Sequence, residues 1–103
     1  MNKEEALKIW LREFGDVDYA HDFTGRKIKR ADYNLENQVG WVVAYMKPLS
    51  LGGYQNEDNE MIVHHITAYE KGDNYPDFEV VGKKYHVGYD EKQDFYYIEK
   101  EVE

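Results

Sequence analysis

The chain has 103 residues and is strongly acidic, with 13 Lys and Arg against 21 Asp and Glu, which gives a formal net charge of −8. This length predicts one domain with a modest core. The chain has no cysteine, which excludes disulfides and thiolate metal sites. Residues 1–10 are too charged for a signal peptide, and no apolar run reaches the ~20 residues of a membrane span. We therefore expect a cytoplasmic protein.

The negative charge is concentrated in the second half of the sequence. Residues 1–56 contain 8 basic and 8 acidic side chains, whereas residues 57–103 contain 5 basic and 13 acidic ones. Because affinity for nucleic acid comes from cationic groups, this distribution argues against direct DNA binding. Two interpretations stay open, namely a solubilising surface and an acidic face that binds a basic partner.

Residues 1–15 are predicted to form a helix. Asn2 is placed to cap it, with Glu5 at the third helical position as in a capping box, and Gly15 is placed to end it. Helical spacing predicts a buried stripe of four apolar side chains: Leu7, Trp10, Leu11 and Phe14. Such a stripe is typical of a helix that covers a sheet.

An acidic turn and a basic hairpin are expected next. Counted from Asp16, the sixth and twelfth positions are His21 and Lys27 rather than the Gly and Glu of a calcium-binding EF-hand, so an acidic turn fits residues 16–25 better. In the following strand Ile28 is the one inward-facing residue. The chain's basic cluster surrounds it: Arg26, Lys27, Lys29 and Arg30. Residues 31–40 form a polar connection.

The central segment, residues 40–73, is predicted to be a strand, a glycine loop and a helix. The strand covers residues 41–46 and ends before Pro48. Asp58 or Asn59 is placed to cap the helix, which Gly72 ends. The spacing of Ile62, Ile66 and Tyr69 predicts the buried face of this helix, and it places His65 closer to the core than His64.

This segment resembles the HNH endonuclease module. Ten positions match the family pattern without a gap: Trp41, Pro48, Ser50, Gly52, Gly53, Asn59, Thr67, Lys71, Gly72 and Asp73. A weaker match extends back to Asp22, Phe23, Gly25, Arg26 and Ile28. The resemblance implies a core of two strands and a helix that in the family surrounds one divalent metal.

The chemical positions of the family are replaced here. By the resemblance, Ala44 stands where the family has a metal-binding Asp, Tyr45 where it has the His that activates water, and Ala68 where it has another ligand. A methyl group cannot bind a metal, and a phenol is a poor base at neutral pH. We therefore expect an HNH-like fold without nuclease activity, metal or other cofactor.

Residues 74–103 are predicted to form an antiparallel meander and an acidic tail. Strands are expected at residues 78–81, 84–89 and 95–102, with a tight connection at Gly82 and Lys83. The tail, residues 99–103, is expected to fray. The fold class is therefore α+β in a single domain, with a helix at 1–15, an HNH-like core at 22–73 and the meander at 74–103.

Three function hypotheses follow. The first is a non-catalytic inhibitor of a nuclease, such as a phage or mobile-element anti-CRISPR protein that binds a CRISPR effector. Its expected contact surface is acidic: Asp90, Glu91, Asp94, Glu99 and Glu101. The second is an active HNH nuclease whose site is rebuilt from displaced ligands: Asp58, Asn59, His64 and His65. The third is an interaction module such as an immunity protein against a nuclease toxin.

Overall fold

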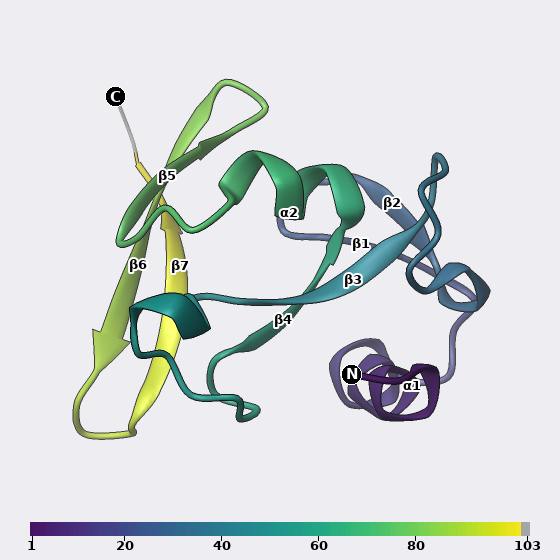
Figure 1. The fold of residues 1–103 in the computed structure, drawn as a ribbon, viewed down its shortest axis with the longest axis horizontal. Coiled ribbons are helices and arrows are strands. Elements are labelled where there is room, and N and C mark those ends of the chain that lie inside the picture. The colour runs from purple at the N-terminus through teal and green to yellow at the C-terminus, as the bar shows by residue number, and fades with distance from the viewer. Residues whose placement is uncertain (102–103) are drawn as a thin grey trace. The chain divides into compact units, whose positions relative to one another are not determined.

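The computed structural model describes residues 1–101 and has the expected α+β fold (Figure 1). Its elements, in chain order, are α1 (Lys3–Phe14), β1 (Tyr19–His21), β2 (Lys27–Lys29), the 3-10 turn η1 (Arg30–Asp32), β3 (Trp41–Tyr45), the 3-10 turn η2 (Leu49–Leu51), β4 (Glu60–His64), α2 (His65–Lys71), β5 (Asp77–Val80), β6 (Lys83–Asp90) and β7 (Phe95–Lys100). Within residues 1–101, neither helix has the length and apolar character needed to cross a bilayer.

The chain divides into two compact units. The N-terminal unit comprises Met1–Val43 and Ile62–Ala68, and the C-terminal unit comprises Ala44–Met61 and residues from Tyr69 onward. The boundary crosses β3, β4 and α2, so each of these elements begins in one unit and ends in the other. The segment 22–73 expected as one core is therefore shared between the two units.

Helix α1 begins and ends as its sequence predicts. The side-chain oxygen of Asn2 accepts a hydrogen bond from the Glu5 amide at 2.9 Å. Gly15 has φ +80°, and its N–H donates to the Leu11 carbonyl at 2.9 Å. The predicted stripe is partly wrong, because the side chain of Leu11 is 50% exposed. The buried residues of the helix are Ala6, Ile9 and Trp10. Leu11 lies 100° around the helix from Trp10 and so leaves that face.

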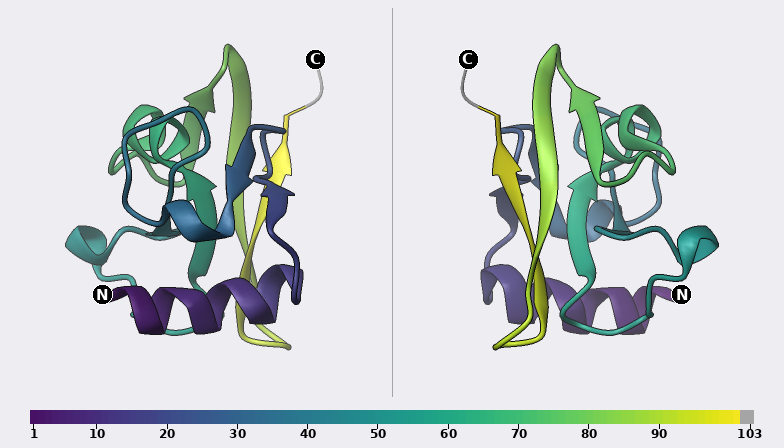
Figure 2. Two further views of the ribbon diagram at one scale, coloured as in Figure 1. Left: turned by 90° about the vertical axis from the view of Figure 1, so that its right-hand side faces the viewer. Right: turned by 90° about the vertical axis from the view of Figure 1, so that its left-hand side faces the viewer.

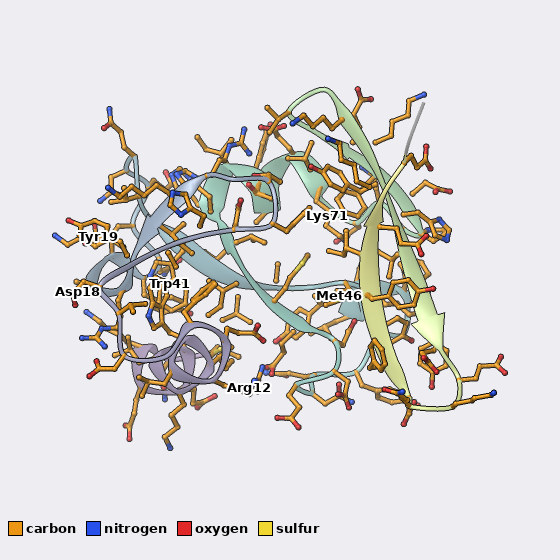
Figure 3. The ribbon with its side chains drawn as sticks, turned by 180° about the vertical axis from the view of Figure 1, so that it is seen from behind. Arg12, Asp18, Tyr19, Trp41, Met46 and Lys71 are labelled. Carbon is orange, nitrogen blue, oxygen red and sulfur yellow. The ribbon has the colours of Figure 1, made fainter. Side chains whose placement is uncertain are left out.

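Aromatic rings fill the core of the N-terminal unit. The Trp10 and Trp41 ring centroids are 5.0 Å apart, and Phe14 meets Trp10 edge-on at 4.9 Å. The indole N–H of Trp10 donates to the Val17 carbonyl at 3.0 Å, and that of Trp41 donates to the Arg30 carbonyl at 3.3 Å. Both rings are therefore buried without an unsatisfied polar group. Figure 3 shows Trp41 beside the helix.

The β1–β2 hairpin has the predicted inward residue. The two strands are antiparallel, and Ile28, opposite Ala20, is fully buried in the same core as Trp10. Strands as short as these contribute few backbone hydrogen bonds, so packing of Ile28 holds the hairpin in place.

The second helix is shorter than predicted, and this expectation is wrong. Residues 60–64 form strand β4, which pairs with β3, and α2 begins only at His65. Ile62 is buried in the strand, whereas Ile66 is 42% and Tyr69 is 88% exposed, so the three do not form one buried face. The run from Met61 to Val63 contains β-branched residues that favour a strand, and the helical spacing of Ile62 with later residues is a coincidence.

Asn59 closes the loop between β3 and β4 instead of capping a helix. Its carboxamide accepts a hydrogen bond from the Lys47 amide at 2.8 Å and donates to the carbonyls of Lys47 and Tyr54, both at 2.9 Å. Gly53 is required beside it, because a Cβ at this position would lie 2.0 Å from the Lys47 carbonyl oxygen. The predicted helix cap at Asp58 or Asn59 is therefore replaced by a loop clamp.

The C-terminal strands form the predicted antiparallel meander, in the order β5-β6-β7. Figure 2 shows the long twisted hairpin of β6 and β7. Four apolar side chains on one face are buried: Phe78, Val80, Tyr85 and Val87. The connection between β5 and β6 lies one residue earlier than predicted, at Val81 and Gly82, which both have positive φ. This is the geometry that joins two strands through a two-residue turn.

The acidic tail is ordered further than expected. Glu99 and Lys100 belong to β7, and the N–H of Glu101 donates to the Lys84 carbonyl at 2.9 Å. The rest of the tail that was expected to fray, residues 102 and 103, lies outside the described residues.

Candidate functional site on the C-terminal sheet

The three positions that replace the HNH chemistry lie on β3 and α2. Ala44 and Tyr45 end β3, and Ala68 is the middle residue of α2. None of the three side chains is a carboxylate or an imidazole. Within residues 1–101, no group of three or more His, Asp and Glu side chains is arranged to hold a metal ion.

His64 and His65 lie at the junction of β4 and α2, not in the middle of a helix as predicted. His64 is the more buried of the two, at 3% exposure, so the predicted order is wrong. Its Nδ1 accepts a hydrogen bond from the Ile66 amide at 3.0 Å, so Nε2 carries the proton that it donates to the Gln38 carbonyl at 2.9 Å. His65 Nε2 lies 2.7 Å from the Asn37 carbonyl oxygen. Both ring nitrogens of His64 are therefore hydrogen-bonded to backbone groups.

A buried carboxylate that the sequence placed only in the weaker part of the HNH match organises the N-terminal unit. Asp22 is 6% exposed. One of its oxygens accepts hydrogen bonds from the Thr24 amide at 2.9 Å, the Thr24 hydroxyl at 2.6 Å and the Arg26 amide at 3.1 Å. The other accepts from the His64 amide at 3.0 Å and the Thr67 hydroxyl at 2.7 Å. Asp22 thus ties the turn of the β1–β2 hairpin to the β4–α2 junction.

These hydrogen bonds lower the pKa of Asp22. Burial by itself would raise its pKa, but the donors, led by the hydroxyls of Thr24 and Thr67, outweigh burial and hold the pKa below the usual 3.8. The carboxylate is therefore ionised at neutral pH. With five donors already on its two oxygens, it is a structural acceptor rather than a general base.

The two arginines of the basic cluster make polar contacts within the N-terminal unit. Arg30 forms ion pairs with Asp16 at 2.7 Å and Asp18 at 3.2 Å, so the predicted acidic turn neutralises it. Arg26 donates to the Thr67 hydroxyl at 2.9 Å. These contacts leave a smaller cationic surface than the sequence cluster implies.

On the outer face of the C-terminal sheet, carboxylates from β5 and β7 lie on either side of the middle strand β6. Across the sheet, Asp77 of β5 lies opposite His86 of β6, which lies opposite Glu99 of β7. The next row is Glu79, Lys84 and Glu101. Alternation along a strand puts these side chains on the face opposite the buried core residues. We call the carboxylates of this surface the acidic face: Asp77, Glu79, Glu99 and Glu101.

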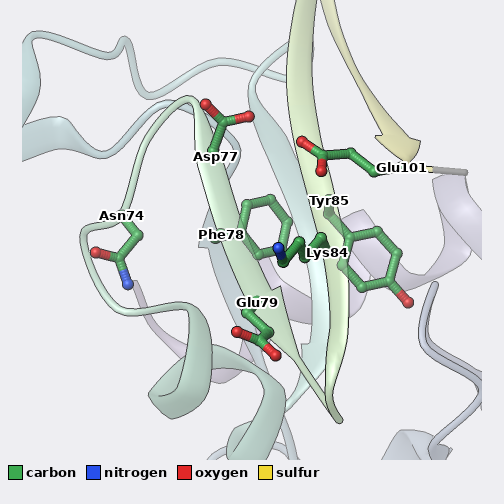
Figure 4. Close-up of a pocket in the computed structure, with 7 residues that line it drawn as sticks. All are labelled: Asn74, Asp77, Phe78, Glu79, Lys84, Tyr85 and Glu101. Carbon is green, nitrogen blue, oxygen red and sulfur yellow. The ribbon is translucent and has the colours of Figure 1, made fainter. Parts of the chain in front are cut away.

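A hollow of about 420 Å³ lies among these residues (Figure 4). Figure 4 shows the carboxylates of Asp77, Glu79 and Glu101 around the Lys84 side chain. Two aromatic rings and an amide complete the lining, from Phe78, Tyr85 and Asn74. The rings of Phe78 and Tyr85 stack with centroids 5.5 Å apart. The hollow thus combines three carboxylates and one lysine with the edges of two largely buried rings.

The structure separates the five carboxylates that the sequence suggested as a contact surface. Asp90, Glu91 and Asp94 lie at the tip of the β6–β7 hairpin, whereas Glu99 and Glu101 lie at the other end of β7. At ~3.3 Å per residue, the seven positions from Asp94 to Glu101 span about 23 Å. They therefore form two surfaces and not one.

The carboxylates at the hairpin tip shape the turn. Asp90 accepts hydrogen bonds from the amides of Lys92 and Gln93, each at 3.0 Å. Asp94 accepts a hydrogen bond from the Tyr89 hydroxyl, which raises the pKa of Tyr89 to about 12. Glu91 is exposed. The carboxylates of Asp90 and Asp94 thus already accept hydrogen bonds within the hairpin.

Sequence reasoning missed Asp77 and Glu79. Asp77 lies just before the strand predicted at residues 78–81 and Glu79 lies within it, and neither belongs to the predicted contact surface. The signal was present in the alternation of β5, where Phe78 and Val80 point inward and Asp77 and Glu79 outward. Only the register of three strands shows that they join Glu99 and Glu101.

The net charge is distributed unevenly between the two units. The C-terminal unit contains 6 basic and 13 acidic residues, net −7, and the N-terminal unit 7 basic and 8 acidic ones, net −1. The acidic face thus belongs to the unit that carries nearly all of the negative charge.

The chain matches no protein-family model, and no curated protein or solved structure proved similar to it.

Proposed function

We propose that this chain is a non-catalytic binding protein that inhibits a nuclease by presenting its acidic face to the enzyme's basic nucleic-acid-binding channel. The observation that carries the proposal is the register of β5, β6 and β7, which puts four carboxylates on one surface. A row of carboxylates mimics the charge of a phosphate backbone, and complementary charge accelerates association with a basic surface.

The HNH resemblance belongs to the same proposal. The order of β3, loop, β4 and α2 supports it, because it supplies two strands followed by a helix. The positions Ala44, Tyr45 and Ala68 support a scaffold without catalysis, since none supplies a metal ligand or a base that works at neutral pH. The hydrogen bonds of Asn59 and His64 weigh against a site rebuilt from displaced ligands.

The nuclease that we place first is a CRISPR effector that cuts with an HNH domain. The protein would then be an anti-CRISPR protein of a phage or mobile element, acting in the cytoplasm of the host. An immunity protein against a nuclease toxin would use the same acidic face. The identity of the bound nuclease separates these two roles.

A cleavage titration tests the proposal. A guide-loaded CRISPR effector cuts plasmid DNA while the chain is added in increasing excess, and a control reaction contains only the chain, plasmid and magnesium or manganese. We expect cleavage to fall as the chain is added and the control plasmid to stay intact. Nicking in the control would overturn the non-catalytic assignment. Full cleavage at every excess would overturn the CRISPR effector as the target.

Charge variants test the surface. The variant Glu79→Gln, Glu99→Gln, Glu101→Gln removes three charges from the acidic face and keeps the side-chain shape. We expect half-inhibition to need about tenfold more protein, since exposed charges contribute about 0.2 to 1 kcal/mol each.

Two matched controls accompany the triple variant. The first removes three exposed charges from the N-terminal unit: Glu4→Gln, Glu13→Gln and Glu36→Gln. The second is Glu91→Lys at the hairpin tip. We expect both to inhibit like the natural chain. Equal inhibition by the acidic-face variant would show that another surface binds the nuclease.

A further inference from the structure

A histidine lies at the centre of the acidic face. His86 is on the middle strand β6, with Asp77 opposite on β5 and Glu99 opposite on β7. Its Nδ1 is 2.8 Å from a carboxylate oxygen of Asp77. Since a carboxylate only accepts, Nδ1 donates and the free nitrogen is Nε2, where protonation converts the ring into a cation.

We propose that protonation of His86 weakens binding of cationic partners to the acidic face, and so makes the face a pH-sensitive docking surface. This inference rests on the proposed function. With neutral His86, Asp77 and Glu99 are available to a lysine or arginine of the partner. With protonated His86, the imidazolium pairs with these carboxylates from within the sheet and competes with the partner's cation.

The direction of the switch follows from the surroundings of His86. The hydrogen bond to Asp77 is the largest effect and raises the pKa of His86 above its usual 6.5; burial opposes this rise, and the negative charges of Asp77, Glu99 and Glu101 add to it. Protonation therefore sets in above pH 6.5 as pH falls. By linkage, a bound cation must favour the neutral ring, so binding near neutral pH releases a proton.

The groups that face His86 come from all three strands. On the outer face, β6 itself contributes Lys84, and β5 contributes Asp77 and Glu79. The β7 side contributes Tyr97, Glu99 and Glu101. Four of the six are carboxylates and one is a cation. Among them, His86 is the group whose charge changes most readily near neutral pH.

Calorimetric titration of the full chain with an octalysine peptide tests the inference. Measurements at low ionic strength and at about pH 8, 7 and 6 compare the natural chain with His86→Gln, which keeps a hydrogen-bond donor but does not titrate. The control His21→Gln changes an exposed histidine of β1 in the N-terminal unit.

We expect the Kd of the natural chain and of the His21 variant to rise about three- to fivefold from pH 8 to pH 6. The Kd of the His86 variant should stay constant. Proton release near pH 7, measured in two buffers of different ionisation enthalpy, should vanish in that variant alone.

Two outcomes would overturn the inference, and they differ. If the peptide binds and His86→Gln keeps the pH dependence of the natural chain, the switch is wrong and the proposed acidic face stands. If the peptide fails to bind at pH 8, the proposed face fails and the switch fails with it. An NMR titration of the His86 ring adds a direct reading, since the peptide should lower its pKa.

Discussion

At the scale of single residues, Asp22 illustrates how a buried charge becomes a structural element. Its two oxygens accept five hydrogen bonds from hydroxyls and amides within the N-terminal unit. Charge-assisted bonds of this kind are the strong ones, and the donors are left unsatisfied if the acceptor is lost.

The variant Asp22→Asn tests this role. The new side-chain NH2 would face the backbone N–H of His64 or of Thr24 with donor against donor, so we expect a loss of about 3 kcal/mol of unfolding free energy. Urea denaturation at neutral pH measures it. The control Asp18→Asn removes an exposed ion pair with Arg30 and should cost at most about 1 kcal/mol. Equal losses in both variants would contradict the role assigned to Asp22.

The same residue sets part of the acid stability. Because the folded pKa of Asp22 lies below the 3.8 of the unfolded chain, its contribution is fully present above pH 3.8. The contribution is lost as pH falls through the folded pKa. The difference in unfolding free energy between the natural chain and Asp22→Asn should therefore shrink on acidification. A difference that grows in acid would contradict the assignment.

At the scale of elements, the pairing of Gly88 with Tyr97 holds β6 and β7 together on the outer face. The two residues are opposite each other in register. A Cβ at Gly88 would lie 2.3 Å from the Tyr97 ring, so the ring covers the glycine backbone. A glycine within a strand usually destabilises the sheet, and an aromatic ring packed over it offsets that loss.

A double-mutant cycle tests this contact. Gly88→Ala pushes the Tyr97 ring off the strand, and we expect it to cost about 1 kcal/mol. In a Tyr97→Ala background the same change has no ring to displace. There it should be neutral or stabilising, because alanine loses less backbone entropy than glycine. Thermal denaturation of the four proteins gives the coupling. Equal effects of Gly88→Ala in both backgrounds would show that the ring does not protect the glycine.

At the scale of the whole molecule, net charge limits stability. The C-terminal unit carries −7, and like charges repel in the folded chain. Raising NaCl from about 0.01 M to about 0.3 M shortens the screening length and weakens this repulsion. We expect the free energy of unfolding to rise by about 1 kcal/mol and Tm to rise by a few degrees. The acidic-face variant Glu79→Gln, Glu99→Gln, Glu101→Gln should respond less. A fall in Tm with salt would mean that favourable ion pairs dominate instead.

The sequence by itself determined the elements whose signals are local. Asn2, Glu5 and Gly15 mark both ends of α1, because caps act on the nearest backbone groups. Alternation along residues 77–100 predicted the meander, since side chains of a strand point to opposite faces in turn. Replacement of the HNH chemical positions at Ala44, Tyr45 and Ala68 is also legible in the sequence alone, and the absence of activity inferred from it stays a prediction.

The tertiary structure decided what depends on distant partners. Residues 60–64 fit helical spacing, but pairing with β3 makes them a strand, because a backbone partner outweighs a weak local preference. The structural role of Asp22 requires donors from Thr67 and His64, more than forty positions away. The acidic face exists only through the register of three strands, which joins Asp77 and Glu79 to Glu99 and Glu101 and places His86 between them. Charge can be counted in a sequence, but its arrangement on a surface is set by which strands pair.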